Sequence, residues 1–358
     1  MARVLMKGTE AIAEAAVRAG CRFFAGYPIT PQNEIPEYMS RRMPEVGGVF
    51  VQGESEVASV NMAFGACCGG ERAMTSSAST GISLKSEGIS YSAAARVPLV
   101  YVNVQRGGPG IGTIQPSQMD YLQATKASGN GGFRMIVFAP ATVQEAVDMT
   151  YRAFELADRD RNPVLVLSDG VVGTMMEPVE LPPMKTEEEL AAIKESKKEW
   201  AGIGHPIGKR SWIEPGTWDT DRWEKANQWN ASLYETWTSE YTTYLLEDAQ
   251  IVIAAYGISA RIAKSAIDDL RAEGVKIGMI RPQIINPYPY EAYDEINYDV
   301  CKMILDVEMA NPALHVVDVE KAVKDRCPIR TCLRSGGNVM QKKNILDAVK
   351  EILKEQGA

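Results

Sequence analysis

Short apolar runs alternate with longer amphipathic segments along the first half of the chain. The runs are rich in β-branched and aromatic residues, and we predict strands at 21–25, 48–52, 72–76, 98–104, 134–138 and 163–168. The segments between them show helical spacing, and we predict helices at 8–19, 31–42, 55–68, 82–95, 117–127 and 142–158. This alternation predicts an α/β fold, with a doubly wound and mainly parallel sheet covered by helices on both faces.

Proline residues and a change of pattern mark the end of this unit near residue 182. A capping-box sequence at Thr186–Glu189 then predicts a charged helix that runs to about Trp200. The stretch 200–245 looks irregular and holds all six tryptophans of the chain. Two interpretations stay open for it. It is either a loop-rich crossover packed by its own aromatic side chains, or a partner surface, since aromatic residues concentrate at interfaces.

A second alternating unit begins at residue 249. We predict a strand, a helix, three further strands and a closing helix at 249–257, 260–273, 275–280, 303–307, 315–319 and 342–354. The chain therefore divides into a first domain at 1–182, a linking segment at 183–247 and a second α/β domain at 248–358.

Composition and charge exclude several classes of protein. The net charge of −8 argues against a general nucleic-acid binder, and no apolar run is long enough to span a membrane or to act as a signal peptide. The six cysteines form no CxxC pair and there are only two histidines, so we expect no zinc, iron–sulfur or other metal site in this chain. Scattered cysteines without an export signal fit a reducing compartment, and we expect a cytoplasmic protein.

Unusual loop sequences follow the first four predicted strands. They are GYPITP from Gly26, GESE from Gly53, SSASTG from Ser76 and QRGGPGIG from Gln105. Because the carboxyl ends of parallel strands meet at one edge of a sheet, where ligands bind, the sequence predicts a binding site at this edge.

The first of these loops leads from a strand into a helix. Thr30 stands where an N-cap residue belongs and Pro31 at the first helical position, which tolerates its missing N–H. A hydroxyl beside free backbone amides predicts a small anion site. The alternative is an ordinary strand-to-helix turn.

Two further loops carry charged candidates. Glu54 and Glu56 flank the start of the predicted helix 55–68. One of them is expected to be a capping group and the other a partly desolvated carboxylate that points into the site. Arg106 enters the glycine-rich loop, where its guanidinium can bind a carboxylate with two parallel hydrogen bonds. The alternative is an arginine paired with an acidic residue at a turn.

These motifs together resemble one family. GYPITP, QGESE before an Ala/Gly-rich helix, TSSASTGISL, and VQRGGPG followed by Gln118 and Asp120 resemble the alpha subunit of 2-oxoacid:ferredoxin oxidoreductases. The resemblance covers nearly the whole chain and is closest to the branched-chain (2-oxoisovalerate) type. It implies a pyrimidine-type thiamine-diphosphate-binding domain followed by a domain like the carboxy-terminal domain of transketolase.

The resemblance also implies an activity and roles for residues. The enzymes convert a 2-oxoacid and coenzyme A to acyl-CoA and carbon dioxide, and pass two electrons to ferredoxin. By resemblance, Glu56 activates the aminopyrimidine of thiamine diphosphate, and Thr30 and Arg106 hold the 2-oxoacid. Tyr27, Pro28 and Ile29 would flank the pyrimidine ring.

Missing motifs predict partner subunits. The near match Ser168-Asp169-Gly170 to a diphosphate motif is not followed by a suitable asparagine, and cluster cysteines are absent. We therefore expect a beta subunit that binds the diphosphate with Mg²⁺, and gamma and ferredoxin-like delta subunits, with the 4Fe-4S clusters on partner chains.

The loop composition favours a substrate class. Many relatives that use dicarboxylic 2-oxoacids have a Ser-Thr pair where this chain has Gly110-Ile111. The change favours a branched aliphatic tail. Versions that use 2-oxoglutarate or pyruvate, and a non-catalytic assembly subunit, remain as alternatives.

Overall fold

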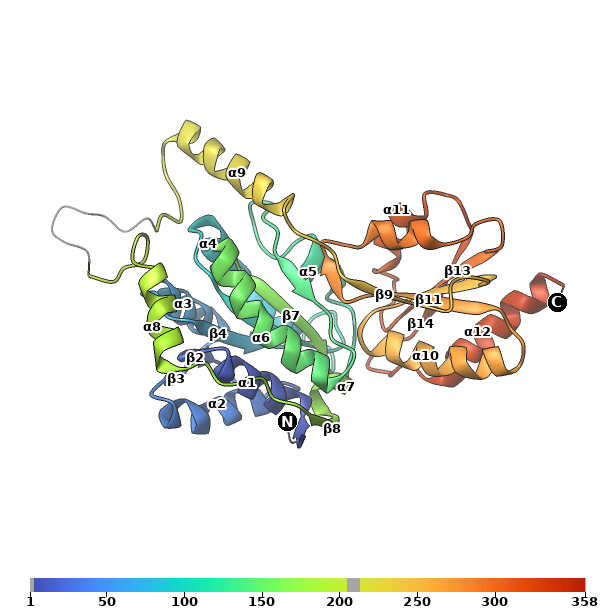
Figure 1. The fold of residues 1–358 in the computed structure, drawn as a ribbon, viewed down its shortest axis with the longest axis horizontal. Helices are drawn as coiled ribbons and strands as arrows, with labels where there is room; N and C mark the ends of the chain where they lie inside the picture. The colour runs from blue at the N-terminus through green and yellow to red at the C-terminus, as the bar shows by residue number, and fades with distance from the viewer. Residues whose placement is uncertain (1–2, 205–212, 358) are drawn as a thin grey trace.

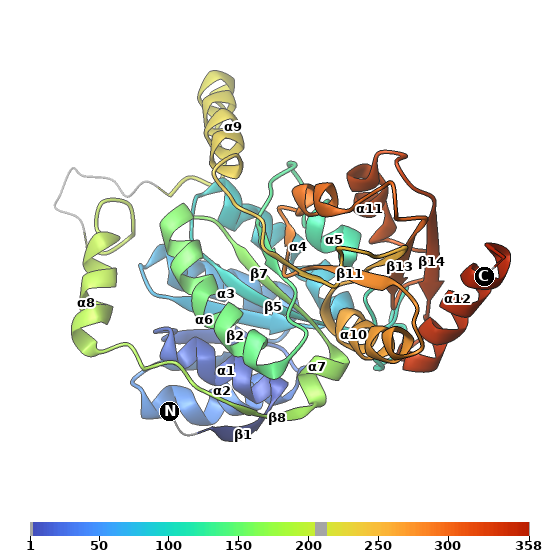
Figure 2. The ribbon, with the colours of Figure 1, turned by 45° about the vertical axis from the view of Figure 1, so that its right-hand side comes forward.

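Two lobes lie side by side in the chain (Figure 1). The computed structural model describes residues 3–204 and 213–357. The larger lobe is built around a seven-stranded sheet, the smaller around a five-stranded sheet, and a two-stranded ribbon joins β1 (Val4–Lys7) to β8 (Met176–Val179). Helix α9 (Thr220–Tyr234) stands out from the larger lobe in both views (Figure 2).

The seven-stranded sheet has the order β12-β6-β7-β5-β4-β2-β3, and only β12 pairs antiparallel with its neighbour. Its strands are β2 (Phe23–Gly26), β3 (Val49–Gln52), β4 (Ala73–Ser77), β5 (Val100–Gln105), β6 (Ile136–Phe138), β7 (Val164–Asp169) and β12 (Ile284–Asn286). The parallel order confirms the doubly wound α/β fold predicted from the sequence.

Helices cover both faces of this sheet because the strand side chains alternate between two cores. One layer holds α1 (Gly8–Arg18), α2 (Glu34–Glu45) and α6 (Val143–Asp160), and the other α3 (Glu56–Cys68), α4 (Ser79–Ala94) and α5 (Tyr121–Thr125). In β5, Val102 faces the first layer and Tyr101 the second. Two more helices, α7 (Gly170–Thr174) and α8 (Glu187–Ser196), follow β7 and β8.

Helices α3 and α4 approach each other closely. A Cβ atom on Gly88 of α4 would lie 2.5 Å from Cγ1 of Val60 in α3. Because Gly88 has no side chain, the two helices can approach each other this closely. Glu56 lies at the start of α3 and Gly81 in the first turn of α4, so this close approach also brings these two residues together.

The smaller lobe repeats the layered plan. Its sheet has the order β14-β13-β10-β11-β9, with β9 antiparallel to β11. The strands are β9 (Tyr241–Tyr244), β10 (Ile251–Ala254), β11 (Ile277–Pro282), β13 (Met303–Glu308) and β14 (Ile329–Leu333). Helices α10 (Gly257–Ala272) and α12 (Lys342–Glu355) cover one face, and α11 (Val316–Val323) and the 3-10 helix η1 (Tyr290–Glu295) cover the other.

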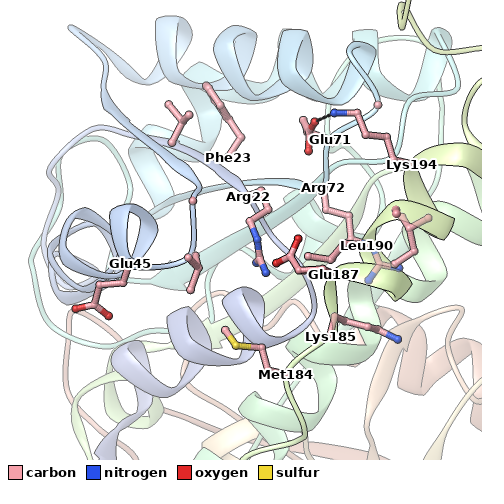
Figure 3. A pocket seen from close by; sticks show the side chains of 17 residues that line it. Arg22, Phe23, Glu45, Glu71, Arg72, Met184, Lys185, Glu187, Leu190 and Lys194 are labelled. Atoms are coloured by element: carbon pink, nitrogen blue, oxygen red, sulfur yellow. Dashed lines mark hydrogen bonds and ion pairs between the residues drawn. The ribbon is translucent and has the colours of Figure 1, made fainter.

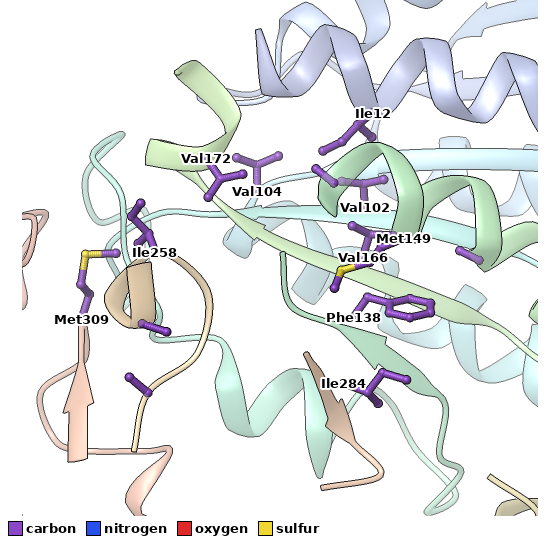
Figure 4. Packing of buried hydrophobic residues seen from close by; sticks show 14 of the residues in the cluster. Ile12, Val102, Val104, Phe138, Met149, Val166, Val172, Ile258, Ile284 and Met309 are labelled. Carbon is purple, nitrogen blue, oxygen red and sulfur yellow. The ribbon is translucent and has the colours of Figure 1, made fainter. Parts of the chain in front are cut away.

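The two lobes share one hydrophobic core (Figure 4). Ile258 of α10 and Met309 after β13 belong to the same cluster as Val172 and Val104 of the larger lobe. Strand β12 also crosses over, because it lies in the second half of the chain but forms the edge of the seven-stranded sheet. The second half of the sequence therefore completes the first sheet.

Three sequence-based predictions were wrong in detail. Residues 315–319 form the start of α11 and not a strand, because the backbone N–H groups of Leu314 and His315 donate to the Glu308 carboxylate and start a helix there. Helix α9 lies in the stretch that was expected to be irregular. The helix predicted at 117–127 is only the short α5.

The tryptophan-rich stretch packs partly on the larger lobe. The Arg96 guanidinium lies 3.7 Å from the ring centre of Trp229, and Trp237 donates a hydrogen bond to Asp160 at 2.9 Å. Trp200 is buried, whereas Trp218 is completely exposed. Trp212 lies outside the described residues. Trp200, Trp229 and Trp237 thus pack on the larger lobe, and Trp237 also contacts Tyr234 of its own stretch. The interpretation as a partner surface stays a prediction.

No described helix combines the length and the apolarity that crossing a membrane requires.

Candidate functional site

The carboxyl ends of β2, β3, β4 and β5 meet at one edge of the larger sheet. The four loops singled out in the sequence all leave the sheet at this edge. Thr30 and Ser55 lie in the loops after β2 and β3, and Arg106 begins the loop after β5. The fold therefore gathers the predicted site residues from the ends of three strands, β2, β3 and β5.

Glu56 is the first residue of α3 and is 7% exposed. Its neighbour Ser55 caps the helix, accepting a hydrogen bond from the Ala58 N–H at 3.1 Å, while Glu54 is exposed. The expectation that one glutamate would be the cap was therefore wrong, because a serine hydroxyl fills that place. Glu56 is therefore largely buried, and within the described residues its carboxylate accepts no hydrogen bond.

Gly81 in the first turn of α4 makes room for this carboxylate. A Cβ atom on Gly81 would lie 2.8 Å from Oε1 of Glu56 and 2.0 Å from Oγ of Ser77. The Ser77 hydroxyl is itself buried and has no partner in the described part of the chain. Helix α4 thus presents bare backbone to the carboxylate of Glu56.

Arg106 is 6% exposed and lies inside its own loop. Its Nη1 donates to the carbonyl of Thr30 at 3.0 Å, and its Nη2 donates to the carbonyl of Ile111 at 2.9 Å and to the hydroxyl of Thr80 at 3.3 Å. Its Nε is buried and has no partner among the described residues, and no described carboxylate forms an ion pair with it. Two of the five guanidinium N–H groups therefore remain available to a ligand, which excludes the alternative of a salt-bridged turn arginine.

A serine and an aspartate fix the backbone of Arg106. The Ser79 hydroxyl accepts from the Arg106 N–H at 3.0 Å and donates to Asp120 at 2.6 Å. Asn103 of β5 donates to the same carboxylate at 2.9 Å. Burial raises the pKa of Asp120, and these two hydrogen bonds oppose that rise.

The structure brings Thr30 and Arg106 together, but Thr30 is not a helix cap. Helix α2 begins at Glu34 with Asn33 as the preceding residue, and Thr30 and Pro31 lie in a turn before it. The buried Gln32 holds this turn, because its side chain donates to the Tyr27 carbonyl at 3.2 Å and accepts from Ser76. The predicted N-cap position of Thr30 was therefore wrong, and the Thr30 hydroxyl instead accepts from Asn33 at 3.3 Å. The predicted anion site stays a prediction.

The three residues between β2 and Thr30 line the same edge. Tyr27 and Ile29 are half-buried and Pro28 is exposed. Their backbone is held by the Gln32 side chain at Tyr27 and by the Gln32 N–H, which donates to the Ile29 carbonyl at 3.1 Å. This segment is therefore ordered and open to a ligand from one side.

Adjacent residues of α4 connect the two charged candidates. Thr80 contacts the guanidinium of Arg106, and Gly81 lies against the carboxylate of Glu56. Both candidates therefore flank the first turn of one helix and belong to a single site.

Lys85 lies one turn further along α4, and sequence reasoning missed it. Its side chain is completely buried, and its Nζ donates to Oγ1 of Thr75 at 2.9 Å and to the backbone carbonyl of Glu56 at 3.3 Å. Burial lowers its pKa to about 7, an effect that the charge of Glu56 opposes. The sequence did offer a way to find it. Lys85 lies four residues after Gly81, on a helix face that otherwise carries small and apolar residues, and this position indicates a buried lysine.

The buried lysine predicts a pH-dependent stability. Between pH 7 and pH 10 the unfolded chain binds a proton at Lys85 that the folded chain does not, so folding should become more favourable as the pH rises. Lys85→Met should stabilise the subunit at pH 7, by on the order of a few kcal/mol, and much less at pH 10. Thermal unfolding of both proteins at the two pH values measures this difference. A difference in unfolding temperature between the two proteins that is the same at pH 7 and at pH 10 would contradict this prediction.

The loop after β5 ends on the smaller lobe. The Gln118 side chain donates to the carbonyl of Tyr256 at 3.0 Å and accepts from the Ser259 hydroxyl at 2.6 Å and from the Met309 N–H at 3.0 Å. The Gln118 N–H also donates to the Met309 carbonyl at 2.9 Å. One residue thus attaches the Arg106 loop to both β13 and α10.

Asp169 has a structural role. Its carboxylate accepts from the N–H groups of Val171 at 2.8 Å and Val172 at 3.1 Å and so caps α7. Burial raises its pKa to about 6. In the sequence Ser168-Asp169-Gly170, which resembles a diphosphate motif, the aspartate therefore caps a helix.

A cavity of about 880 Å³ lies at the opposite edge of the sheet, where β2, β3 and β4 begin (Figure 3). Arg72, Lys185 and Lys194 line it together with α8. These three cations are paired with acidic side chains, Arg72 with Asp158 and Glu155, Lys185 with Glu155 and Lys194 with Glu71. A fourth cation, Arg22, also lines the cavity and donates to the carbonyls of Val17 and Cys21. Since it lies away from the strand ends that carry Glu56 and Arg106, this cavity is not the candidate site.

Comparisons with known proteins identify the family of this chain. A family model described as pyruvate flavodoxin/ferredoxin oxidoreductase, thiamine diP-bdg, matches residues 14–240, and one described as pyruvate:ferredoxin oxidoreductase core domain II matches residues 249–345. The ketoisovalerate oxidoreductase subunit VorB of Methanothermobacter marburgensis is 42% identical, and the match covers 99% of each chain. The 2-oxoglutarate synthase subunit KorA of Methanothermobacter thermautotrophicus is 33% identical, over 96% of this chain and 97% of the relative.

A solved structure shares the fold. The 2-oxoglutarate:ferredoxin oxidoreductase from Magnetococcus marinus, determined with 2-oxoglutarate, coenzyme A and succinyl-CoA bound, superimposes with a TM-score of 0.80 at 24% identity. The match covers 98% of this chain but 65% of that one, so this chain spans about two thirds of its length. The two family models and the full-length relatives place the chain in the 2-oxoacid:ferredoxin oxidoreductase family, as an enzyme subunit.

Proposed function

We propose that this chain is the catalytic subunit that binds the pyrimidine half of thiamine diphosphate in a ferredoxin-dependent oxidoreductase acting on branched-chain 2-oxoacids. The overall reaction would convert 2-oxoisovalerate, coenzyme A and oxidised ferredoxin to isobutyryl-CoA, carbon dioxide and reduced ferredoxin. The observation that carries the proposal is the buried carboxylate of Glu56, which has no partner within the described residues and faces the bare backbone of Gly81.

The residues present fit the pyrimidine end of thiamine diphosphate. A buried carboxylate without a hydrogen-bond partner is costly unless a ligand supplies one, and an aminopyrimidine offers a ring nitrogen that can share a proton with the carboxyl group. The half-buried Tyr27 and Ile29 and the exposed Pro28 provide an apolar wall at the same edge. When bound, the cofactor supplies a nucleophilic carbon that the protein side chains lack.

Each residue of the chain has a defined task in this proposal. Glu56 holds a proton at the ring nitrogen of the pyrimidine. Arg106 binds the carboxylate of the 2-oxoacid with its two remaining N–H groups, and the Thr30 hydroxyl donates to the keto oxygen. Because Thr30 and Arg106 contact each other, the two substrate contacts keep a fixed separation.

The exposed surface around the site supports a need for partner subunits. Val57 and Met62 of α3 and Leu84 and Tyr91 of α4 are between 38% and 54% exposed. Apolar side chains that gather beside a site are typical of a surface covered in an assembly. We propose that a beta subunit covers this face and supplies the diphosphate-binding half with Mg²⁺, and that gamma and ferredoxin-like delta subunits complete an enzyme whose 4Fe-4S clusters lie on those partner chains.

Ile111 is the residue that favours an aliphatic substrate. Its side chain is 84% exposed at the tip of the Arg106 loop, while its carbonyl is held by Nη2 of Arg106. The flanking Gly110 and Gly112 have φ angles of 66° and 55°, a conformation in which a side chain would be strained. The loop therefore presents one apolar side chain close to the group that binds the substrate carboxylate.

Replacing Ile111 tests this assignment. Ile111→Thr should lower the ratio of kcat/KM for 2-oxoisovalerate to that for 2-oxoglutarate by about tenfold, since a pocket contact of this size is worth roughly 1–3 kcal/mol. Ile111→Val is the matched control, because it keeps the β-branch and adds no hydroxyl. Equal ratios in the Thr variant and the wild type would contradict the assignment.

The proposed activity is tested directly with the assembled complex. Turnover with 2-oxoisovalerate, 2-oxoglutarate, pyruvate and aryl pyruvates, measured with coenzyme A and a viologen acceptor, should be fastest for 2-oxoisovalerate. A clear preference for 2-oxoglutarate would support the second candidate, which the full-length match to a 2-oxoglutarate synthase subunit keeps open. Turnover that does not depend on this subunit would favour a non-catalytic assembly role.

A further inference from the structure

Lys85 is a buried cation that the proposed chemistry does not use. It lies in α4 with no exposed surface, and no described carboxylate forms an ion pair with it. Its two hydrogen-bond partners are the hydroxyl of Thr75 and the backbone carbonyl of Glu56. Burial of an ammonium group without a direct ion pair is unfavourable, so these contacts call for an explanation.

The contacts of Lys85 join three segments that form the site. Thr75 of β4, which accepts from Lys85, donates its own proton to the carbonyl of Ala25 in β2 at 2.7 Å. Ala25 lies two residues before Tyr27, where the first site loop begins. Through one ammonium group, α4 therefore holds the start of α3, the strand β4 and the end of β2.

Helix α4 also contacts Glu56 at two points one turn apart. Gly81 lies against the carboxylate, and Lys85 binds the carbonyl of the same residue. The ammonium group thus lies within hydrogen-bond distance of the backbone of Glu56, one turn from the glycine that faces its carboxylate. A neutral side chain of the same length would fill the space but would not supply this charge.

We propose that Lys85 is a positioning residue for Glu56, which fixes the first turn of α3 and places a positive charge behind the carboxylate. This inference rests on the proposed function of Glu56. Below about pH 7, where the Lys85 amine is protonated, its charge lies near the proton that Glu56 and a bound ring nitrogen would share, so Lys85 would act on that proton as well as on the fold of the turn.

Few other charges face this space. Helix α3 contributes Glu56, α4 contributes Lys85, and the loop after β5 contributes Arg106 and Asp120, which contact Thr80 and Ser79 at the start of α4. The strands β2 and β4 contribute only neutral residues, among them Thr75 and Ser77. Lys85 is therefore the only described cation that contacts Glu56 through a hydrogen bond.

The test uses the assembled complex with variants that separate charge from hydrogen bonding. Lys85→Met removes both, and Lys85→Gln keeps a donor without a charge. Lys197→Met is the matched control, because Lys197 is also buried but pairs with Asp158 away from the site. The measurements are the affinity for thiamine diphosphate, the proton uptake on its binding from calorimetry in two buffers, and the pH profile of kcat/KM.

We expect Lys85→Met to weaken thiamine diphosphate binding about tenfold and to move the midpoint of proton uptake, and the acidic limb of the profile, up by about one pH unit. Lys85→Gln should bind thiamine diphosphate almost as tightly as the wild type does. It should still show the upward pH shift that is expected for Lys85→Met. Lys197→Met should change neither. If Lys85→Met does not assemble, the pH shift in Lys85→Gln decides the question alone.

Glu56→Gln distinguishes failure of this inference from failure of the proposed function. If Glu56→Gln removes the acidic limb and both Lys85 variants leave it at the wild-type pH, the positioning role is wrong and the proposed function stands. If Glu56→Gln itself keeps the wild-type limb and the wild-type proton uptake, the proposed function fails, and the role of Lys85 fails with it.

Discussion

Glu56→Gln is expected to lower turnover of the assembled complex by about 10²–10⁴-fold, the range typical of losing a positioned acid–base group. The change keeps the size of the side chain and removes its ability to give up a proton. Because the Glu56 carboxylate makes no hydrogen bond to the described residues, the amide breaks no internal side-chain contact, and the subunit should fold and assemble normally. Turnover of 2-oxoisovalerate with a viologen acceptor measures the loss.

The neighbouring glutamate provides the matched control. Glu54→Gln makes the same chemical change two residues away, at an exposed position, and should leave turnover unchanged. Near wild-type turnover in Glu56→Gln would show that the buried carboxylate is not catalytic and would favour an assembly subunit that has kept the fold.

Gly81→Ala should weaken thiamine diphosphate binding by about 10–100-fold, although alanine favours helices more than glycine does. The new methyl group would lie 2.0 Å from Oγ of Ser77 and 2.8 Å from Oε1 of Glu56, so the carboxylate must move. Overpacking of this kind costs about 1–3 kcal/mol, which corresponds to that loss of affinity. Calorimetric titration of the complex with the cofactor measures it.

Gly65 offers the matched control for Gly81. It lies in α3, and a Cβ atom there would meet no atom within 4 Å. Gly65→Ala should therefore raise the unfolding temperature slightly, because alanine is favoured in a helix by up to about 1 kcal/mol, and should leave cofactor affinity unchanged. Equal affinities in the two alanine variants would show that the contact between Gly81 and Glu56 does not shape the site.

The sequence was most informative where local pattern and sheet geometry agree. The alternation of strands and helices predicted the doubly wound sheet, and the rule that strand ends meet at one edge predicted that Glu56, Thr30 and Arg106 would gather there. Those predictions needed only the order of the elements. The resemblance of the loop motifs to one family was then confirmed by the full-length relatives.

The parts that could not be predicted depend on contacts between distant residues. The apolar run from His315 reads as a strand, but the carboxylate of Glu308 binds the N–H groups at its start and makes it a helix. Thr30 reads as a cap, but the buried Gln32 holds it in a turn. Lys85 was not singled out from the sequence, because its burial depends on α3 and β4, which pack against it in the folded chain.

The position of Gln118 has a consequence for dissecting the enzyme. Its side chain ties the substrate loop to Tyr256, Ser259 and Met309 of the smaller lobe, whereas Glu56 is held entirely by elements of the larger lobe. A change at Gln118 would therefore loosen the anchor of the arginine and leave in place the elements that hold the cofactor carboxylate. Substitution of this glutamine, and not truncation, should separate recognition of the vitamin from recognition of the oxoacid, because β12 and the shared core make the larger lobe depend on the second half of the polypeptide.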